Sequence, residues 1–207
     1  MIDKPAGIPV HAGSGGGANL EDFLPGIQGD AKMVPQLAHR LDRDTSGCLI
    51  LGRTKAALRT LGKLFEQKRI HKTYWALVAG VPSAKQGRID LAMEKQTQDK
   101  RRWHMKIDPE GQPAITDYQV MGSSGNLSWL VLRPKTGRTH QLRVHCASQG
   151  WPIIGDRFYG EPDDDRHLML HAASLTIPFE HEKPPIIVHA PPPMHMREDL
   201  EKCGWAL

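Results

Sequence analysis

Apolar residues recur along the chain with a helical period in some segments and concentrate in short runs in others. After Thr54, apolar residues fall at positions 57, 58, 61, 64 and 65, the spacing of a helix with one buried face. Thr54 is a suitable N-cap for it. A second helix is predicted over 139–149, stopped by a glycine and a proline, and a third over 194–202. The pattern therefore predicts three helices separated by long non-helical stretches.

Strands are predicted where aromatic and β-branched residues concentrate between turn residues, most clearly at 71–80. The remaining strands are expected at 48–51, 101–107, 114–121, 128–133, 168–177 and 186–189. A turn, Asp-Pro-Glu-Gly at 108–111, joins two of them. Because strands follow one another through hairpins and do not alternate with helices, we predict an α+β fold. Its central sheet is expected to be mixed, mostly antiparallel, and flanked by helices and loops.

Composition limits the class of protein. A length of 207 residues allows one sizeable core or two closely packed halves. No run approaches the ~20 apolar residues of a membrane span, and the N-terminus does not resemble a signal peptide. The three cysteines lack C-x-x-C spacing and cannot all pair, which favours a reducing cytoplasm. We therefore expect a cytoplasmic protein with no membrane partner.

The positive charge is concentrated in two runs. Net charge is +4 at pH 7, which by itself is modest support for a polyanionic partner. The runs are Arg53, Lys55, Arg59, Lys63, Lys68, Arg69 and Lys72, and Lys95, Lys100, Arg101, Arg102 and Lys106. They fit a surface that follows a phosphate backbone, and equally a solvated helix face and hairpin.

Candidate chemistry centres on the segment His39–Gly47, H-R-L-D-R-D-T-S-G. Asp42 lies between Arg40 and Arg43, and neighbouring cations favour the ionised form of a carboxyl group. An ionised aspartate can act as a nucleophile, and the strand that follows gives it a rigid support. The segment has the character of an active-site loop.

A second polar segment, Pro134–His145, reads P-K-T-G-R-T-H-Q-L-R-V-H. Arginines at the start of a helix suit phosphate or carboxylate binding. Arg143 could point inward at a buried acid, although an amphipathic helix with exposed polar residues fits the same pattern.

No cofactor or metal is expected. The glycine-rich run at 13–18 lacks the preceding strand of a dinucleotide site, and neither H-E-x-x-H nor a Cys/His ligand cluster occurs.

Together these motifs resemble those of the RluA-type pseudouridine synthases. The similarity includes D-K-P-A-G-I-P-V-H near the N-terminus, the two segments above, K-T-Y at 72–74, P-I-I-G-D-x-x-Y-G at 152–160 and L-M-L-H-A at 168–172. It covers essentially the whole chain in the order of the family. The resemblance implies a single catalytic domain over 1–207 without an N-terminal S4-type RNA-binding domain. It also implies a catalytic cleft across the sheet.

The resemblance further implies a role for each matching residue. Asp42 would attack the ring or the sugar of the target uridine, Tyr74 would pack on the base and remove the C5 proton, and Arg143 would pair with Asp42. Arg40 would fill the stack left by the flipped nucleotide. The remaining RNA-binding candidates are Lys72, Arg138, Thr139, His140 and Gln141. The isomerisation is redox-neutral, in keeping with the absence of cofactor and metal motifs.

The expected substrate is structured RNA. The loop H-A-G-S-G at 11–15 resembles most the branch that acts on large-subunit ribosomal RNA, with transfer RNA as the alternative. Two other classes stay open, an inactive RNA-binding module and a metal-dependent phosphodiesterase. The intact Asp42, Tyr74 and Arg143 argue against the first, and the missing metal motif argues against the second. We expect a monomer.

Overall fold

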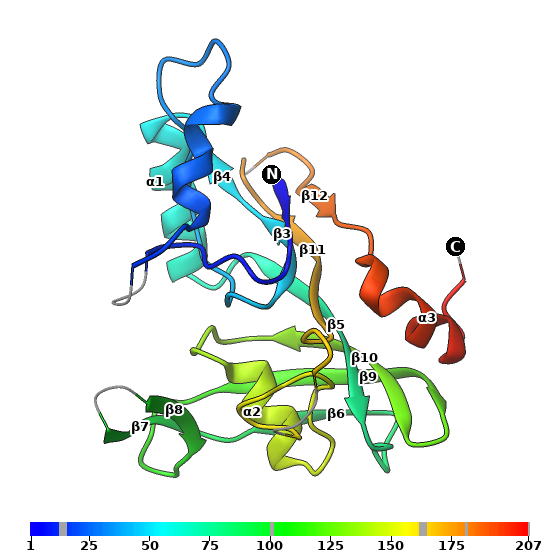
Figure 1. Ribbon diagram of the computed structural model, residues 1–207. Coiled ribbons are helices and arrows are strands. Elements are labelled where there is room, and N and C mark those ends of the chain that lie inside the picture. The colour runs from blue at the N-terminus through cyan, green and yellow to red at the C-terminus, as the bar shows by residue number, and fades with distance from the viewer. Residues whose placement is uncertain (13–15, 100–101, 162–164, 181, 207) are drawn as a thin grey trace. The chain divides into compact units, whose positions relative to one another are not determined.

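The chain forms two compact units in the computed structural model, which describes residues 1–12, 16–99, 102–161, 165–180 and 182–206 (Figure 1). The first unit comprises Met1–Lys72 and Ala172–Pro191, and the second comprises Thr73–His171 and Pro192–Leu207. The single catalytic domain inferred from the motifs stays a prediction.

The first unit contains short strands, one 3-10 helix and one long helix. Its elements are β1 (Ile2–Lys4), η1 (Leu20–Ile27), β2 (Gln36–Leu37), β3 (Ser46–Leu49), β4 (Leu51–Gly52), α1 (Lys55–Glu66) and β12 (Ile186–His189), with most of β11 (Leu170–Ile177). Strand order is β1-β3-β11, β12 pairs with β11, and β2 pairs with β4. β1 pairs antiparallel with β3, so that Asp3 lies opposite Cys48 and Lys4 opposite Gly47.

The helix predicted after Thr54 is confirmed as α1. The Thr54 hydroxyl accepts a hydrogen bond from the Ala57 backbone N–H at 3.1 Å, as an N-cap does. Leu61 and Leu64 are buried on the inner face. The helix ends in a Schellman motif, in which the N–H of Arg69 donates to the Leu64 carbonyl at 2.9 Å and the residue before it is left-handed.

The second unit is built on four antiparallel strands in the order β5-β10-β9-β6. Its elements are β5 (His71–Ala79, whose first two residues belong to the first unit), β6 (Gln86–Asp90), β7 (Met93–Asp99), β8 (Arg102–Ile107), β9 (Ile115–Ser124), β10 (Leu127–Pro134), α2 (Gln141–Ser148) and α3 (Met194–Lys202). β7 and β8 form a separate hairpin. The predicted α+β class with mostly antiparallel strands is confirmed.

The core of the second unit joins the strands to both helices. Leu77 of β5 and Leu130 of β10 are fully buried in it, together with Cys146 of α2 and Leu200 of α3. Mutual burial of these apolar side chains is the main source of stability for such a layer. Helix α2, which carries Gln141 and Arg143, is thereby anchored to the strands.

Several elements differ from the sequence-based predictions. α2 begins at Gln141, two residues later than predicted, because His140 adopts a left-handed conformation with φ of 53° that no helix can include. β7 was not predicted because its sequence, M-E-K-Q-T-Q-D, has no apolar alternation. η1 and β6 were also not predicted. Lys100 and Arg101 of the second basic run lie outside the described residues.

The three cysteines are free thiols and all are buried. Burial raises the pKa of Cys48 to about 11 and also raises the pKa of Cys146 and of Cys203. Among the residues that the structure describes, no helix has the length and apolar character to cross a bilayer.

Candidate active site

Asp42 lies in the loop between β2 and β3 of the first unit, with its side chain partly exposed. The backbone turns directly after it, because the N–H of Thr45 donates to the Asp42 carbonyl at 3.2 Å. Leu41 and Thr45 are buried on either side. The sequence thus presents one half-exposed carboxylate from a loop whose neighbouring residues are fixed in the core.

Lys4 supports this loop from inside the first unit, and sequence reasoning gave it no role. Its ammonium group is 0% exposed and donates to the carbonyls of Pro5, Ile8 and Arg43, each at 2.8 Å. Burial lowers the pKa of Lys4 to about 8, while the charges of Asp44 and Asp42 raise it. The bond to Arg43 ties the residue directly after Asp42 to the N-terminal strand.

His39 fixes the other end of the loop. Its Nε2 accepts a hydrogen bond from the Ile50 N–H at 3.0 Å, and its ring lies 4.8 Å from the ring of Phe65. Burial, and secondly the charge of Lys72, lower the pKa of His39 to about 4. The imidazole is therefore neutral at pH 7, as an acceptor at Nε2 requires.

The two arginines that flank Asp42 point to different surroundings. Arg43 donates from Nε to the Gly7 carbonyl at 3.0 Å and lies 3.9 Å from the Asp44 carboxylate. Arg40 is exposed. An exposed guanidinium is available to a ligand, in accord with the predicted wedge role of Arg40, which stays a prediction.

Gly47 explains the last residue of the loop motif. Its φ is 107°, a conformation that side-chain-bearing residues rarely adopt. A Cβ there would collide with the backbone carbonyl oxygen of Ala172 in the neighbouring strand β11. Only glycine allows β3 to begin this close to β11.

Tyr74 and Lys72 are neighbours on β5 that belong to different units. Tyr74 pairs with Leu132 of β10 and packs, partly buried, against the core of the second unit. Lys72 is half-buried at the end of the first unit, and burial lowers its pKa. The strand therefore holds the ring of Tyr74 on a rigid support.

Arg143 is a buried cation held by a carboxylate of its own unit. It donates from Nε and Nη2 to the two oxygens of Asp156, at 2.8 and 2.7 Å, and both side chains are at most 4% exposed. Asp156 also accepts the backbone N–H groups of Phe158 and Tyr159. This bidentate pair fixes the guanidinium plane, and the inward orientation predicted for Arg143 is present.

The rings that follow Asp156 complete the setting of α2. The guanidinium carbon of Arg143 lies 5.2 Å from the ring centre of Phe158 and 5.3 Å from that of Tyr159. The Tyr159 hydroxyl accepts a hydrogen bond from the Met105 N–H at 2.9 Å and shares a second hydrogen bond with Nδ1 of His140, also at 2.9 Å. His140 and Arg143 are thus brought together by the segment 156–159, to which the sequence analysis gave no roles.

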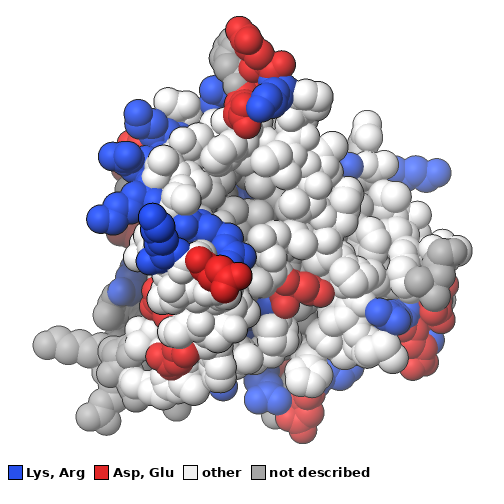
Figure 2. Space-filling view, turned by 90° about the horizontal axis from the view of Figure 1, so that it is seen from above, with Lys and Arg blue, Asp and Glu red and all other residues white. Residues whose placement is uncertain are grey.

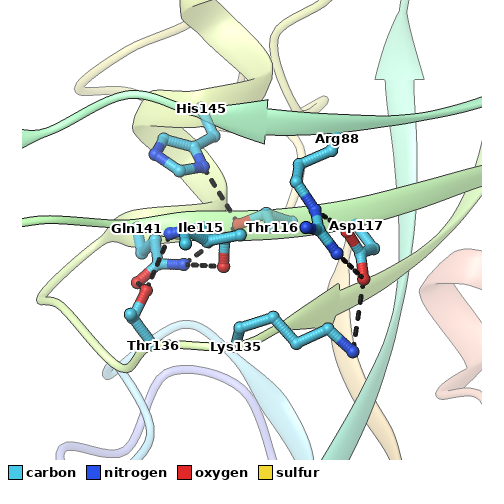
Figure 3. A network of polar contacts seen from close by, with 8 residues as sticks. All are labelled: Arg88, Ile115, Thr116, Asp117, Lys135, Thr136, Gln141 and His145. Carbon is cyan, nitrogen blue, oxygen red and sulfur yellow. Dashed lines mark hydrogen bonds and ion pairs between the residues drawn. The ribbon is translucent and has the colours of Figure 1, made fainter.

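Gln141 belongs to an internal network rather than to the surface (Figure 3). Its amide nitrogen donates to the Ile115 carbonyl and the Thr116 hydroxyl, and its amide oxygen accepts the Thr136 hydroxyl at 2.7 Å. The hydrogen-bond network continues from the Thr116 hydroxyl to Nδ1 of His145, whose pKa is lowered by burial. The predicted RNA contact of Gln141 stays untested, and its side chain here locks the turn that precedes α2.

The same turn presents two further candidates. Thr139 is exposed. Arg138 is half-exposed and donates from Nε to the Pro113 carbonyl at 3.1 Å, while its backbone N–H donates to Gln141 at 3.0 Å. In the described part of the chain, no three His, Cys, Asp or Glu side chains are grouped as metal ligands would be.

The predicted site residues are divided between the two units. Arg40, Asp42 and Lys72 belong to the first, and Tyr74, Arg138, Thr139, His140, Gln141 and Arg143 belong to the second. Buried polar contacts within the first unit hold the loop of Asp42, and buried polar contacts within the second hold Gln141 and Arg143. The pairing of Asp42 with Arg143 stays a prediction.

Known proteins are similar to this chain in sequence and in fold. A family model described as RNA pseudouridylate synthase matches residues 1–148. An RNA pseudouridine synthase of Zymomonas mobilis is 44% identical over 196 residues, covering 93% of this chain and 89% of that protein. Ribosomal large subunit pseudouridine synthase C of Vibrio cholerae is 31% identical over 214 residues, covering 100% and 67%. The solved structure of human RNA pseudouridylate synthase domain containing 4 has a TM-score of 0.81 at 26% identity, covering 98% and 88%.

The chain therefore belongs to the RNA pseudouridylate synthase family. The resemblance to the RluA-type enzymes inferred from the motifs is confirmed. The protein is an RNA-modifying isomerase that converts uridine to pseudouridine.

Proposed function

We propose that this enzyme modifies uridines of large-subunit ribosomal RNA. The observation that carries the proposal is the similarity over the full chain to ribosomal large subunit pseudouridine synthase C of Vibrio cholerae. Transfer RNA is the alternative substrate, and nothing specific favours it. Action in the cytoplasm as a monomer completes the proposal.

Asp42 acts as the nucleophile in this proposal. The reaction breaks the bond between N1 and C1′, rotates the uracil and joins C5 to C1′; the C5 proton leaves and N1 gains a proton. The half-exposed carboxylate on a loop fixed by Lys4 and His39 suits attack on a flipped nucleotide, because a rigid support keeps the reacting oxygen in place. Tyr74, on its strand, packs on the base and accepts the C5 proton.

Arginine side chains serve this chemistry in two ways. Arg143 is proposed to orient Asp42, with its own orientation set by Asp156. Arg40 is proposed to occupy the stack vacated by the target nucleotide, because a planar guanidinium can stack where a base has left. Lys72, Arg138, Thr139 and His140 contact the RNA nearby.

Tritium release from RNA that contains 5-³H-uridine tests the proposal. The wild-type enzyme is expected to release tritium from a large-subunit ribosomal RNA transcript in the presence of EDTA, and to release much less from transfer RNA transcripts. Asp42→Asn is expected to lose at least 10³-fold in rate, because an amide is no nucleophile.

Asp44→Asn is the matched control, since it neutralises a partly exposed carboxylate of the same loop two residues away. It is expected to keep the rate within about threefold of wild type. Release that requires added Mg²⁺, or that persists in Asp42→Asn, would contradict the nucleophile. Equal release from both RNA classes would contradict the ribosomal preference.

A further inference from the structure

Helix α1 carries a straight row of cations on its outer face. Lys55, Arg59 and Lys63 follow one another at intervals of four residues, which places them about 6 Å apart along the helix. All three are exposed, and none has an ion-pair partner among the residues that the structure describes. Figure 2 shows Lys and Arg gathered on the side of the molecule where α1 lies in Figure 1. The row is a largely positive surface, with the exposed Glu66 at its C-terminal end.

The row opposes the stability of its own helix. Like charges at i and i+4 repel each other, and Lys55 lies in the first turn, where the helix dipole disfavours a cation. The first turn contains no acidic residue. In α3, by contrast, the ammonium of Lys202 bonds to Glu198 at 2.9 Å and to Asp199 at 2.8 Å. A helix face that is only solvated is expected to carry both signs of charge, as α3 does, whereas the row on α1 carries cations alone.

One position within α1 and one just after it reduce stability without a packing reason. Gly62 lies in the helix interior on the exposed face, between Arg59 and Lys63, and no atom lies within 4 Å of the place of its Cβ. Glycine there costs backbone entropy and leaves the backbone open to close approach. Lys68 takes the left-handed position after the helix, with φ of 56°, where glycine is the usual residue.

We propose that this row, Lys55, Arg59 and Lys63 with Lys68 at its end, binds the sugar-phosphate backbone of the RNA substrate outside the target nucleotide. The inference rests on the proposed RNA substrate. The spacing of the row is similar to the separation of neighbouring phosphates on one RNA strand, so three cations can neutralise three phosphates. The gap at Gly62 lets the strand approach the helix closely.

The test compares two triple variants by their steady-state kinetics. Lys55→Gln/Arg59→Gln/Lys63→Gln removes the row. Lys85→Gln/Lys183→Gln/Lys202→Gln removes the same charge from exposed lysines outside α1, of which Lys183 and Lys202 are ion-paired. For tritium release from ribosomal RNA, the row variant is expected to raise KM about tenfold at 0.15 M salt with kcat unchanged. The slope of log KM against log salt is expected to fall by roughly 2, as for three lost phosphate contacts.

The control triple is expected to change KM by less than about threefold. Equal effects of the two triples, or a row variant with the wild-type KM and salt slope, overturn the proposal. Row-dependent binding to vesicles of anionic phospholipid without an effect on RNA overturns it as well. Failure of the wild-type enzyme to release tritium is a separate outcome, because it removes the proposed substrate.

Lys68→Gly provides an independent readout. Glycine relieves the left-handed strain, so the Tm is expected to rise by about 2–4 °C. KM is expected to rise about twofold at the same time, because one phosphate contact is lost. A structural role alone predicts the gain in Tm with KM unchanged, which would remove Lys68 from the row.

Discussion

Each unit contains a buried cation at its part of the candidate site. In the first unit it is Lys4, which supports the loop of Asp42, and in the second it is Arg143 itself; the two cations are held in different ways. Lys4 of the first unit donates to three backbone carbonyls. Arg143 of the second unit is held by both oxygens of Asp156 and by two aromatic rings. Burial lowers the pKa of the Lys4 ammonium, so it can lose its proton, whereas a guanidinium stays charged. The first unit thus has a titratable support and the second a permanent one.

Removing the carboxylate that pairs with Arg143 is expected to have the largest effect. Asp156→Ala leaves the guanidinium of Arg143 buried and uncompensated, which costs about 3–5 kcal/mol of the free energy of unfolding. Urea denaturation monitored by tryptophan fluorescence measures the loss. Asp117→Ala, which removes a carboxylate paired at the surface with Arg88 and Lys135, is the control. It is expected to cost less than about 1 kcal/mol, and a similar cost for Asp156→Ala would contradict the assigned role.

Removing the first cation is expected to cost less. Lys4→Met keeps the length of the side chain but leaves three carbonyls without their donor, partly offset because no ammonium must be desolvated. The expected loss is about 2 kcal/mol in the same urea experiment. Lys32→Met, at an exposed lysine of the same unit, is expected to stay within about 0.5 kcal/mol of wild type. Equal results for the two lysines would show that the carbonyl cage contributes nothing.

The pH dependence of the free energy of unfolding also distinguishes the two cations. The pKa of Lys4 is about 8 in the folded chain and 10.5 in the reference state. Between these values the unfolded chain binds more protons, so the contribution of Lys4 to the free energy of unfolding rises with pH from about 8 to 10.5 and is nearly constant below this window. The cost of Lys4→Met is therefore expected to grow by about 3 kcal/mol between pH 7.5 and 10.5.

The cost of Asp156→Ala is expected to stay constant over the same range, because arginine does not titrate there. Unfolding curves of the wild-type chain and both variants at each pH give the two differences directly. A flat pH profile for Lys4→Met would mean that its ammonium keeps its ordinary affinity for protons.

Local patterns predicted the elements whose signals are local. α1 was found from its cap and apolar period, and α3 over the same residues as predicted, because caps and periodicity act within one helix. The start of α2 was misplaced because the local pattern does not indicate the left-handed backbone of His140, whose ring bonds to Tyr159, 19 positions away. The polar strand β7 gains its conformation from pairing with β8 and not from its own residues.

The candidate site was predicted in part for the same reason. The motifs identified Asp42 and Arg143 but assigned no part to Lys4 or Asp156. The Lys4 ammonium meets the carbonyl of Arg43, 39 residues away, and a carbonyl leaves no mark in the sequence. The pattern around Arg143 allowed a buried acid as its partner without identifying one, and the family resemblance pointed to Asp42. Asp156 could have been singled out by its place in the quoted G-D-x-x-Y-G segment.

The buried thiols give each unit its own reporter. Cys48 lies in the first unit, and Cys146 and Cys203 lie in the second. A thiol that is shielded from solvent and reluctant to ionise reacts with an alkylating reagent only when its surroundings open. The rates at which these three sulfurs are modified under native conditions therefore measure how often each unit opens. These rates compare how often the first and the second unit open, without any engineered probe.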